Sequence, residues 1–190
     1  MRMRAGGRRG HRRWRAVLAG LAVLLLSGCA TVAATFVARP RVDAVQTVDA
    51  LYVIGPAEGG IADARRLMAE GKARTLVVTM TMDTRTGKVY PKDMCDPAAW
   101  EVVCVKPDPY TTRGEAAALA RLATERGWSR VAVMTDTSHI ARTRLWMDRC
   151  VPVPVSVWAS SERRTPLSWA GAVVYQSGAW VKAQIQPRCP

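Results

Sequence analysis

The sequence predicts an α/β domain with a mostly parallel β-sheet, preceded by an N-terminal membrane anchor. From residue 48 onward, short apolar runs typical of buried strands alternate with segments of helical periodicity. This alternation is typical of a parallel sheet covered by helices on both faces. Ahead of it, an arginine-rich leader runs into an uncharged apolar stretch. We therefore divide the chain into residues 1–47, holding leader, anchor and linker, and residues 48–190, the domain.

The positive charge of the chain is concentrated in the leader. The formal net charge is +13, but seven of the 28 basic residues precede Ala16, where no acidic residue occurs. The remaining residues carry 21 basic and 15 acidic side chains, which describes a mildly basic domain and not a basic binding stripe. The charge pattern therefore argues against nucleic acid as a partner.

Residues 16–38 are apolar or small and uncharged. About 20 such residues span a bilayer as a helix, and a basic segment before an apolar one is also the pattern of an export signal. Leu26-Ser27-Gly28-Cys29 resembles a bacterial lipobox, which makes Cys29 a candidate for lipidation. An uncleaved helix and a lipoprotein both stay open. Because the arginines remain cytoplasmic, both outcomes place the domain on the extracytoplasmic face of the cell membrane.

The periodicity predicts the following elements in the domain. Strands are expected at residues 48–54, 75–80, 101–105, 131–135 and 151–158. Helices are expected at residues 61–70, 114–126, 138–150 and 167–185. The two prolines of the last strand suit an edge position, and residues 81–108 are expected to form a long, irregular excursion of the kind that is often functional.

Four cysteines lie in the domain, namely Cys95, Cys104, Cys150 and Cys189. An even number in a chain that carries an export signal predicts two disulfides. Cys95 with Cys104 is the local pairing, and Cys150 with Cys189 would hold the C-terminal tail. A zinc site is the alternative, although the chain has no CxxC spacing and His139 is the only histidine of the domain. A free, buried Cys150 is a further alternative.

Ligands of open α/β sheets bind beyond the carboxyl ends of the strands, and three segments at such ends hold candidate site residues. The first is residues 55–60 (GPAEGG), where Gly55, Gly59 and Gly60 would let backbone N–H groups approach a ligand at a helix N-terminus. The run is not a GxGxxG pattern, and a tight turn between strand and helix is the structural alternative.

The second segment is residues 111–115 (TTRGE). Thr112 and Glu115 have the spacing of a capping box, in which each side chain bonds a free backbone N–H of the other. The functional interpretation instead makes Arg113 or Glu115 a ligand contact.

The third segment is residues 135–142 (TDTSHIAR). Ser138 is expected to cap the helix that follows. His139 and Arg142 are three residues apart and share a helix face, where the helix dipole and the arginine charge favour an anion. His139 could give or take a proton, although a lone histidine is often structural.

These motifs, in their order, resemble the YdcF-like (DUF218) family, which includes the SanA and ElyC envelope proteins. The likeness covers residues 48–150 and follows VDALYVIGP, a helix ending in GKA, TLVVT, TTRGEAAALARLATERGW, VAVMT and SHIARTRLWMDRC. Its most specific parts are the glutamate of the long helix and the His-x-x-Arg pattern.

The resemblance implies a Rossmann-like three-layer fold, a membrane anchor and a role in cell-envelope or peptidoglycan homeostasis, with no settled reaction. It points to Glu115 and His139 as catalytic candidates and to Arg142 as a ligand contact. It points more loosely to Gly55, Thr112 and Thr135 as ligand-binding residues. In place of the family's common Ser-Gly-Gly after the second strand, this chain has Thr-Met-Thr at 79–81, and Ala116 stands where an asparagine is frequent. The first departure removes a glycine-rich cradle for a nucleotide-like cofactor.

We therefore expect a membrane-anchored envelope protein whose pocket binds a small anionic or phosphate-bearing ligand. A non-catalytic binding or scaffolding protein with the same fold is the alternative. The sequence predicts no metal site and identifies no cofactor.

Overall fold

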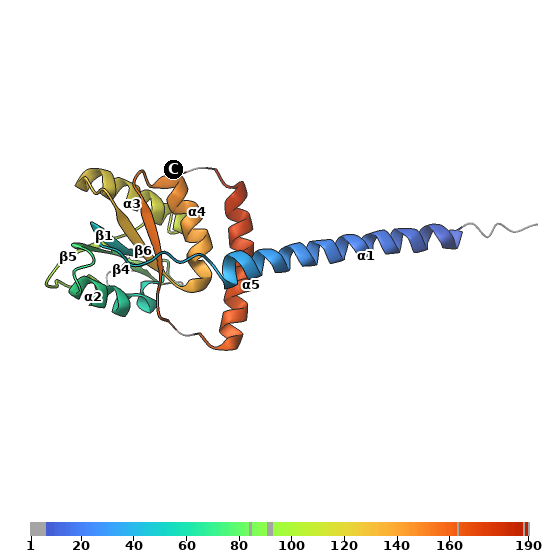
Figure 1. The fold of residues 1–190 in the computed structure, drawn as a ribbon, viewed down its shortest axis with the longest axis horizontal. Coiled ribbons are helices and arrows are strands. Elements are labelled where there is room, and N and C mark those ends of the chain that lie inside the picture. The colour runs from blue at the N-terminus through green and yellow to red at the C-terminus, as the bar shows by residue number, and fades with distance from the viewer. Residues whose placement is uncertain (1–6, 84, 91–92, 163, 188, 190) are drawn as a thin grey trace, which may run out of the picture.

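The computed structural model describes residues 7–83, 85–90, 93–162, 164–187 and 189 (Figure 1). Its main sheet has five parallel strands in the order β5-β2-β1-β6-β7. The strands are β1 (Ala50–Val53), β2 (Thr75–Thr79), β5 (Glu101–Val105), β6 (Val131–Thr135) and β7 (Val155–Ala159). Counted along the chain, these five strands lie in the order 3-2-1-4-5, as in the doubly wound Rossmann fold. The predicted α/β class and parallel sheet are confirmed.

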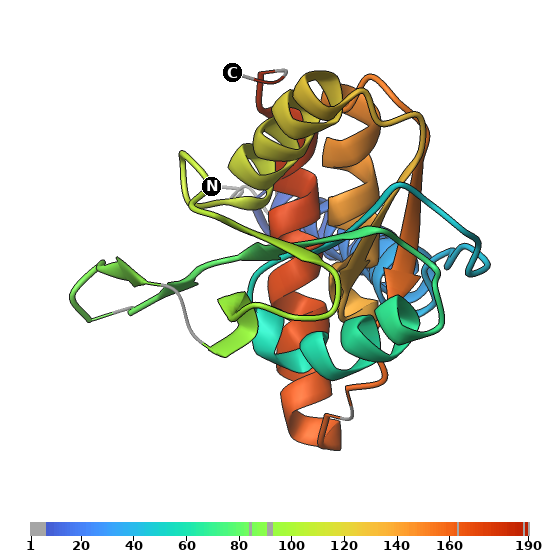
Figure 2. The same cartoon turned by 90° about the vertical axis from the view of Figure 1, so that its left-hand side faces the viewer.

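Helices flank both faces of this sheet (Figures 1 and 2). The three helices are α2 (Ile61–Ala69), α3 (Thr112–Arg126) and α4 (Ile140–Cys150). Successive residues of β1 point to opposite faces, so Leu51 and Val53 pack in the core beneath α2, whereas Tyr52 packs in the core beneath α3 and α4. Burial on both faces explains why the strands read as continuous apolar runs in the sequence.

The last helix, α5 (Pro166–Ile185), packs against α4 and the short 3-10 helix η4 (Thr137–His139). It lies on the side of the domain from which α1 (Gly7–Val32) departs (Figure 1). A π-helical segment, η1 (Ala33–Ala38), joins α1 to the domain and contacts α5, η4 and α4. α5 is therefore the element on which the N-terminal helix meets the domain.

The N-terminal helix has the length and composition of a membrane span. Residues 13–38 are long and apolar enough to cross a bilayer, and none of their most apolar window is buried in the structure. The segment is thus not a core helix of the domain, and it could anchor the chain in a membrane. Cys29 lies exposed within α1 as a free cysteine, and its lipidation stays a prediction.

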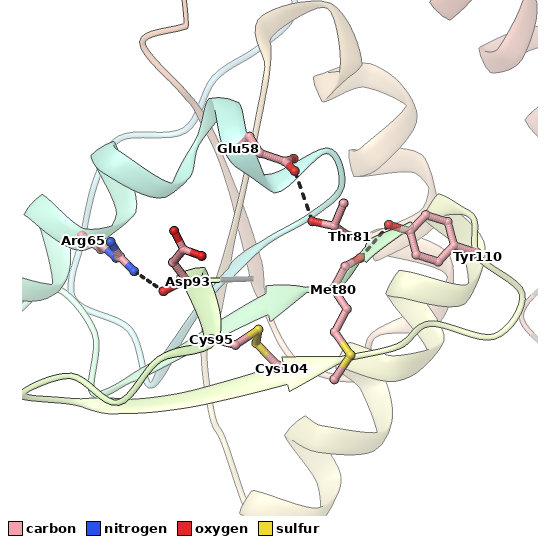
Figure 3. Close-up of a disulfide and its surroundings, with 8 residues drawn as sticks. All are labelled: Glu58, Arg65, Met80, Thr81, Asp93, Cys95, Cys104 and Tyr110. Carbon is pink, nitrogen blue, oxygen red and sulfur yellow. Dashed lines mark hydrogen bonds between the residues drawn. A yellow bond between two sulfur atoms is a disulfide. The ribbon is translucent and has the colours of Figure 1, made fainter. Parts of the chain in front are cut away.

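A disulfide fixes part of the excursion predicted at residues 81–108 to the sheet (Figure 3). It contains an antiparallel pair of two-residue strands, β3 (Thr81–Met82) and β4 (Val89–Tyr90), the 3-10 turn η3 (Asp93–Cys95) and the edge strand β5. The Cys95–Cys104 bond ties η3 to β5. On the other side, Arg65 of α2 donates to the Asp93 carbonyl oxygen at 2.8 Å. The excursion is therefore fixed to the sheet and to a helix at the same point.

Both predicted disulfides are present, Cys95–Cys104 and Cys150–Cys189. The second joins the end of α4 to the segment after α5. Because the four domain cysteines are all paired, they form neither the alternative zinc site nor a free thiol at Cys150. Disulfides persist in oxidising compartments, in keeping with a domain outside the cytoplasm.

We expect the double variant Cys150→Ala, Cys189→Ala to lower the free energy of unfolding by about 2–4 kcal/mol. The double variant Cys95→Ala, Cys104→Ala should lower it less, because its cysteines are 9 residues apart and the other pair 39, and a longer closed loop restricts the unfolded chain more. Urea unfolding followed by circular dichroism compares the two. A larger loss for the short loop would contradict this account.

Several element boundaries differ from the prediction, and two of them have clear local reasons. β7 begins at Val155 and not at residue 151, because Pro152 and Pro154 lack the N–H that a strand ladder needs. The helix predicted to begin at Ser138 begins as η4, and its cap is Asp136, whose Oδ1 accepts the Ser138 N–H at 3.0 Å. Ser138 is therefore not the N-cap residue; its backbone N–H is the group that Asp136 caps.

Candidate functional site

A pocket of about 520 Å³ lies at the carboxyl end of the sheet. Its walls come from the segments that follow β1 and β6, the N-terminal end of α3, the start of α4, the segment after β7, and α5. β1 and β6 are neighbours where the strand order reverses, which is the switch point at which open α/β sheets bind ligands. The pocket therefore lies where the topology favours a binding site.

The residues that the sequence predicted for the site fall into two groups. Those that line the pocket are Gly55, Thr112, Glu115, His139 and Arg142. Those that do not line it are Gly59, Gly60 and Thr135. The fold thus brings three strand ends together as predicted, but leaves most of the glycine-rich turn outside.

The two outlying glycines lie in the turn between β1 and α2. Gly60 precedes α2, and a Cβ there would lie 3.1 Å from Cγ1 of Val53, so close packing explains this glycine without a ligand. Gly59 ends the 3-10 turn η2 (Ala57–Gly59), where a Cβ would overlap only the carboxylate of Glu162. This carboxylate is the end of an exposed, flexible side chain that can move aside, so the contact does not require glycine at position 59.

Glu115 is buried at the start of α3 and bonded to the sheet. Its Oε1 accepts the Gly55 N–H at 2.7 Å and the Thr79 hydroxyl at 2.8 Å. Because Thr79 gives its single proton to Glu115, the Tyr52 hydroxyl, 2.9 Å from Thr79 Oγ1, donates to Thr79. Burial raises the pKa of Glu115, although these bonds and the charge of Arg142 oppose the shift. The carboxyl group therefore holds a proton more readily than an exposed one.

The N-terminal end of α3 is set by close backbone contact. The helix begins at Thr112, and its cap is Thr111, whose hydroxyl accepts the Gly114 N–H at 3.3 Å. The predicted capping box does not form, because Glu115 is bonded to the sheet. A Cβ at Gly114 would overlap the carbonyl oxygen of Pro109. Glycine at this position lets the chain before α3 pass against the helix and form one wall of the pocket.

His139 is buried with both ring nitrogens occupied. Nε2 lies 3.1 Å from Thr112 Oγ1, and Nδ1 lies 3.0 Å from Thr135 Oγ1. Burial lowers the pKa of His139 well below its usual value, and the charges of Arg142 and Arg164 act in the same direction. A neutral imidazole donates from one nitrogen and accepts at the other, so the threonines satisfy both. This geometry suits a positioning role for His139 better than proton exchange with a ligand.

Arg142 is the cation between α3 and α5. Its Nη1 donates to Thr112 Oγ1 at 2.7 Å, and its Nε donates to Gln176 Oε1 at 2.9 Å. A guanidinium has five N–H donors in a planar fork, of which these two bonds use two. Arg142 therefore joins two helices and presents the same charged group to the pocket.

Arg164 is a second pocket cation, which the sequence analysis missed. Its Nη2 lies 3.5 Å from Asp136 Oδ2 and 4.0 Å from Glu162 Oε2, longer than direct charge-assisted hydrogen bonds. Its Nε is buried without a hydrogen-bond partner among the described residues. Arg164 follows the strand predicted at residues 151–158, so the strand-end rule that singled out His139 could have found it.

Tyr110 forms an aromatic part of the pocket wall, and its hydroxyl is bonded to a backbone carbonyl that does not line the pocket. Tyr110 lines the pocket, and its hydroxyl donates to the Met80 carbonyl oxygen at 2.7 Å (Figure 3). Burial raises the pKa of Tyr110, with the charges of Glu115 and Glu58 acting in the same direction. The phenol therefore stays protonated and fixed, and it contributes its ring to the wall.

The electrostatic balance of the pocket favours an anion. Arg142, Arg164, Asp136 and Glu115 all line it, Asp136 is the acid next to Arg164, and the raised pKa of Glu115 makes its carboxyl group easier to protonate. The N-terminal end of α3 adds a positive partial charge. Within the described ranges, no three His, Cys, Asp or Glu side chains form a group that could hold a metal ion.

A comparison of the chain with protein-family models, with curated proteins and with solved structures found no match.

Proposed function

We propose that this chain is a membrane-anchored, YdcF-like protein of the cell envelope whose extracytoplasmic domain binds a small anionic ligand, such as a phosphate-bearing one. The observation that carries the proposal is the convergence of Arg142 and Arg164 on one pocket at the switch point of a parallel sheet. Guanidinium groups match the geometry of phosphate and carboxylate oxygens. The resemblance of the sequence motifs supports the family part of the proposal, and the two pocket arginines support the anionic ligand.

The location rests on three features of the chain. Residues 13–38 could span a bilayer, and the arginine-rich leader ahead of them favours a cytoplasmic N-terminus. The two disulfides favour an oxidising compartment for the domain. Together they support a cell-membrane protein with its domain on the outer face.

We expect a reporter that is active only outside the cytoplasm to be active when fused after residue 190, because the leader should stay inside. Activity of a cytoplasm-only reporter at the same point would refute this orientation. Mass spectrometry of the N-terminus of the purified protein then separates an intact Met1 from a lipidated Cys29.

Binding of inorganic phosphate to the purified full-length protein, measured by calorimetry, tests the pocket. Arg164→Gln should weaken the affinity roughly 10- to 100-fold, because a hydrogen bond to a charged group contributes about 1.5–3 kcal/mol. Arg164 is a better choice than Arg142, whose side chain also joins Thr112 to Gln176, so that its loss would change stability.

The matched control is Arg121→Gln. Arg121 is exposed on α3, pairs with Glu125 at 3.6 Å and does not line the pocket. This variant should bind phosphate as the native chain does. Equal losses in both variants would show that phosphate responds only to net charge, and absence of phosphate binding by the native chain would contradict the proposal.

Glu115 favours an enzymatic version of this function. It is a buried acid with a raised pKa that lines the same pocket, and such a group can exchange a proton with a bound substrate. The non-catalytic alternative uses the pocket without proton exchange. Glu115→Gln separates the two, because glutamine can keep the bonds to Gly55 and Thr79 but does not titrate. If the protein is an enzyme, Glu115→Gln should retain phosphate binding but lose turnover. If it is a binding protein, the variant should keep the activity that the native protein has in the cell.

A further inference from the structure

α5 carries an apolar stripe on its outer surface. The stripe consists of Leu167, Gly171, Val174, Gly178, Val181 and Ile185, all exposed. Spacings of three and four residues place these positions on one helix face. Leu167, Val174 and Ile185 are 84%, 75% and 85% exposed, so these three side chains pack little against the rest of the described chain. The opposite face is the packed one, where Gln176 and Ala183 are buried.

The composition of α5 is not that of a solvated surface helix. Lys182 is its one charged residue between Pro166 and Ile185. A helix on the surface of a globular domain normally presents charged and polar residues outward. An uninterrupted apolar stripe on a helix of 20 residues needs an apolar surrounding on that side.

The position of α5 relative to α1 indicates what the apolar surrounding of the stripe is. Phe36 of η1 stacks on Trp180 of α5 with ring centroids 5.1 Å apart, and Val37 beside it is buried. Because α5 packs its inner face on α4 and η4, its outer face points away from the sheet, which is the direction in which α1 runs (Figure 1). Figure 2, seen from the sheet side, shows α5 running behind the sheet and crossing the base of α1.

We infer that α5 is an interfacial helix, which lies in the headgroup layer of the bilayer that α1 crosses and immerses its apolar stripe in that layer. The inference rests on the proposed membrane anchoring. A helix that lies across the base of a membrane span meets the bilayer surface with its outer face, and burial of apolar side chains at the acyl boundary stabilises this position.

The polar groups around the stripe fit a phospholipid surface. Arg39 and Arg41 follow η1 and are exposed, as is Lys182 on α5, and such side chains meet lipid phosphates at a membrane surface. Tyr175 lies beside the stripe and is exposed, and tyrosine is enriched at membrane–water interfaces. A second copy of the chain would explain the apolar stripe but not this basic and aromatic border.

Spin labels on the full-length protein in vesicles of phosphatidylethanolamine and phosphatidylglycerol test the inference. The background is Cys29→Ser, which leaves the two disulfides as the only native cysteines. Single labels are placed at Val174→Cys on the stripe, Leu24→Cys on α1, and Ala69→Cys, an exposed position on α2 at the far side of the sheet. Collision with oxygen, which dissolves in lipid, is compared with collision with a water-soluble nickel chelate.

We expect the oxygen-to-nickel collision ratio to be several-fold higher at Val174 than at Ala69, and highest at Leu24. A low ratio at Val174 with a high ratio at Leu24 would overturn the interfacial helix and leave the anchor standing. A low ratio at Leu24 would overturn the anchor itself, and the inference with it. Shielding of Val174 from both reagents would show that a second copy covers α5, which also overturns the inference. A label at Ile185→Cys repeats the measurement at the other end of the stripe.

Discussion

Replacing Gly114 by alanine should lower the free energy of unfolding by about 3 kcal/mol, or more if the backbone does not move. A Cβ at this position would overlap the Pro109 carbonyl oxygen, and it would lie 3.0 Å from the carbonyl carbons of Asp108 and Pro109. These are backbone atoms, so rotation of a side chain cannot relieve the contact. Urea unfolding followed by circular dichroism measures the loss.

The matched control for this variant is Gly178→Ala. Gly178 also lies within a helix, but nothing lies within 4 Å of the Cβ that alanine would add. Alanine is a better helix former than glycine by roughly 0.5–1 kcal/mol, so this variant should be as stable as the native chain or more stable. Equal stability of the two variants would contradict the close approach of α3 to the segment before it.

Glu115→Ala should lower the free energy of unfolding by about 2–6 kcal/mol, because it leaves one buried and one half-buried donor without an acceptor at about 1–3 kcal/mol each. The donors are the Gly55 N–H and the Thr79 hydroxyl. Glu115→Gln should recover most of this loss, since the amide oxygen can accept from both. A loss of the same size in both variants would show that the two hydrogen bonds are not the cause.

Glu115→Gln should also change how stability depends on pH. Because the pKa of Glu115 is raised in the folded chain above its usual 4.5, the folded chain binds this proton more tightly than the unfolded one. The resulting stabilisation is fully present below the unfolded pKa and is lost as the pH rises through the folded pKa. The native chain should therefore lose stability relative to Glu115→Gln across this window. Thermal unfolding of both proteins at a series of pH values checks the sign, and parallel curves would contradict it.

The fold could be predicted because strands that are buried on both faces appear in the sequence as continuous apolar runs. The run at residues 131–135 coincides with β6, and the cysteine count predicted both disulfides. Element ends were less predictable, because neighbouring residues compete for the same role. Thr111 and Thr112 can each cap a helix, and the structure uses Thr111, while Thr112 Oγ1 is bonded to His139 and Arg142, which lie far along the chain.

The candidate site was predictable in part of its membership, because Gly59, Gly60 and Thr135 do not line the pocket, and the hydrogen-bond partners of its members were not predictable. Glu115, His139 and Arg142 line one pocket, because parallel strands bring their carboxyl ends to one edge. The partner of Glu115 is Gly55, 60 residues away, and a long-range pairing of this kind depends on strand order. Without that order, His139 could not be recognised as a ring with both nitrogens occupied. Arg164 could have been found from its place after the last predicted strand, but its pairing with Asp136 depends on the placement of β7 beside β6.

The hydrogen bond from Arg142 to Gln176 links the pocket to the outermost helix of the domain. Gln176 lies on the inner face of α5, 2.9 Å from Arg142 Nε, and the stripe lies on the outer face of the same helix. A change in the tilt of α5 would therefore move an acceptor of the pocket's central cation. Linkage is reciprocal. A pocket ligand that draws Arg142 away from α5 would change the affinity of α5 for lipid, and lipid would change the affinity of the pocket for that ligand by the same factor. If α5 lies in the bilayer surface as inferred above, this bond would connect lipid contact on one face of the helix to the pocket on the other.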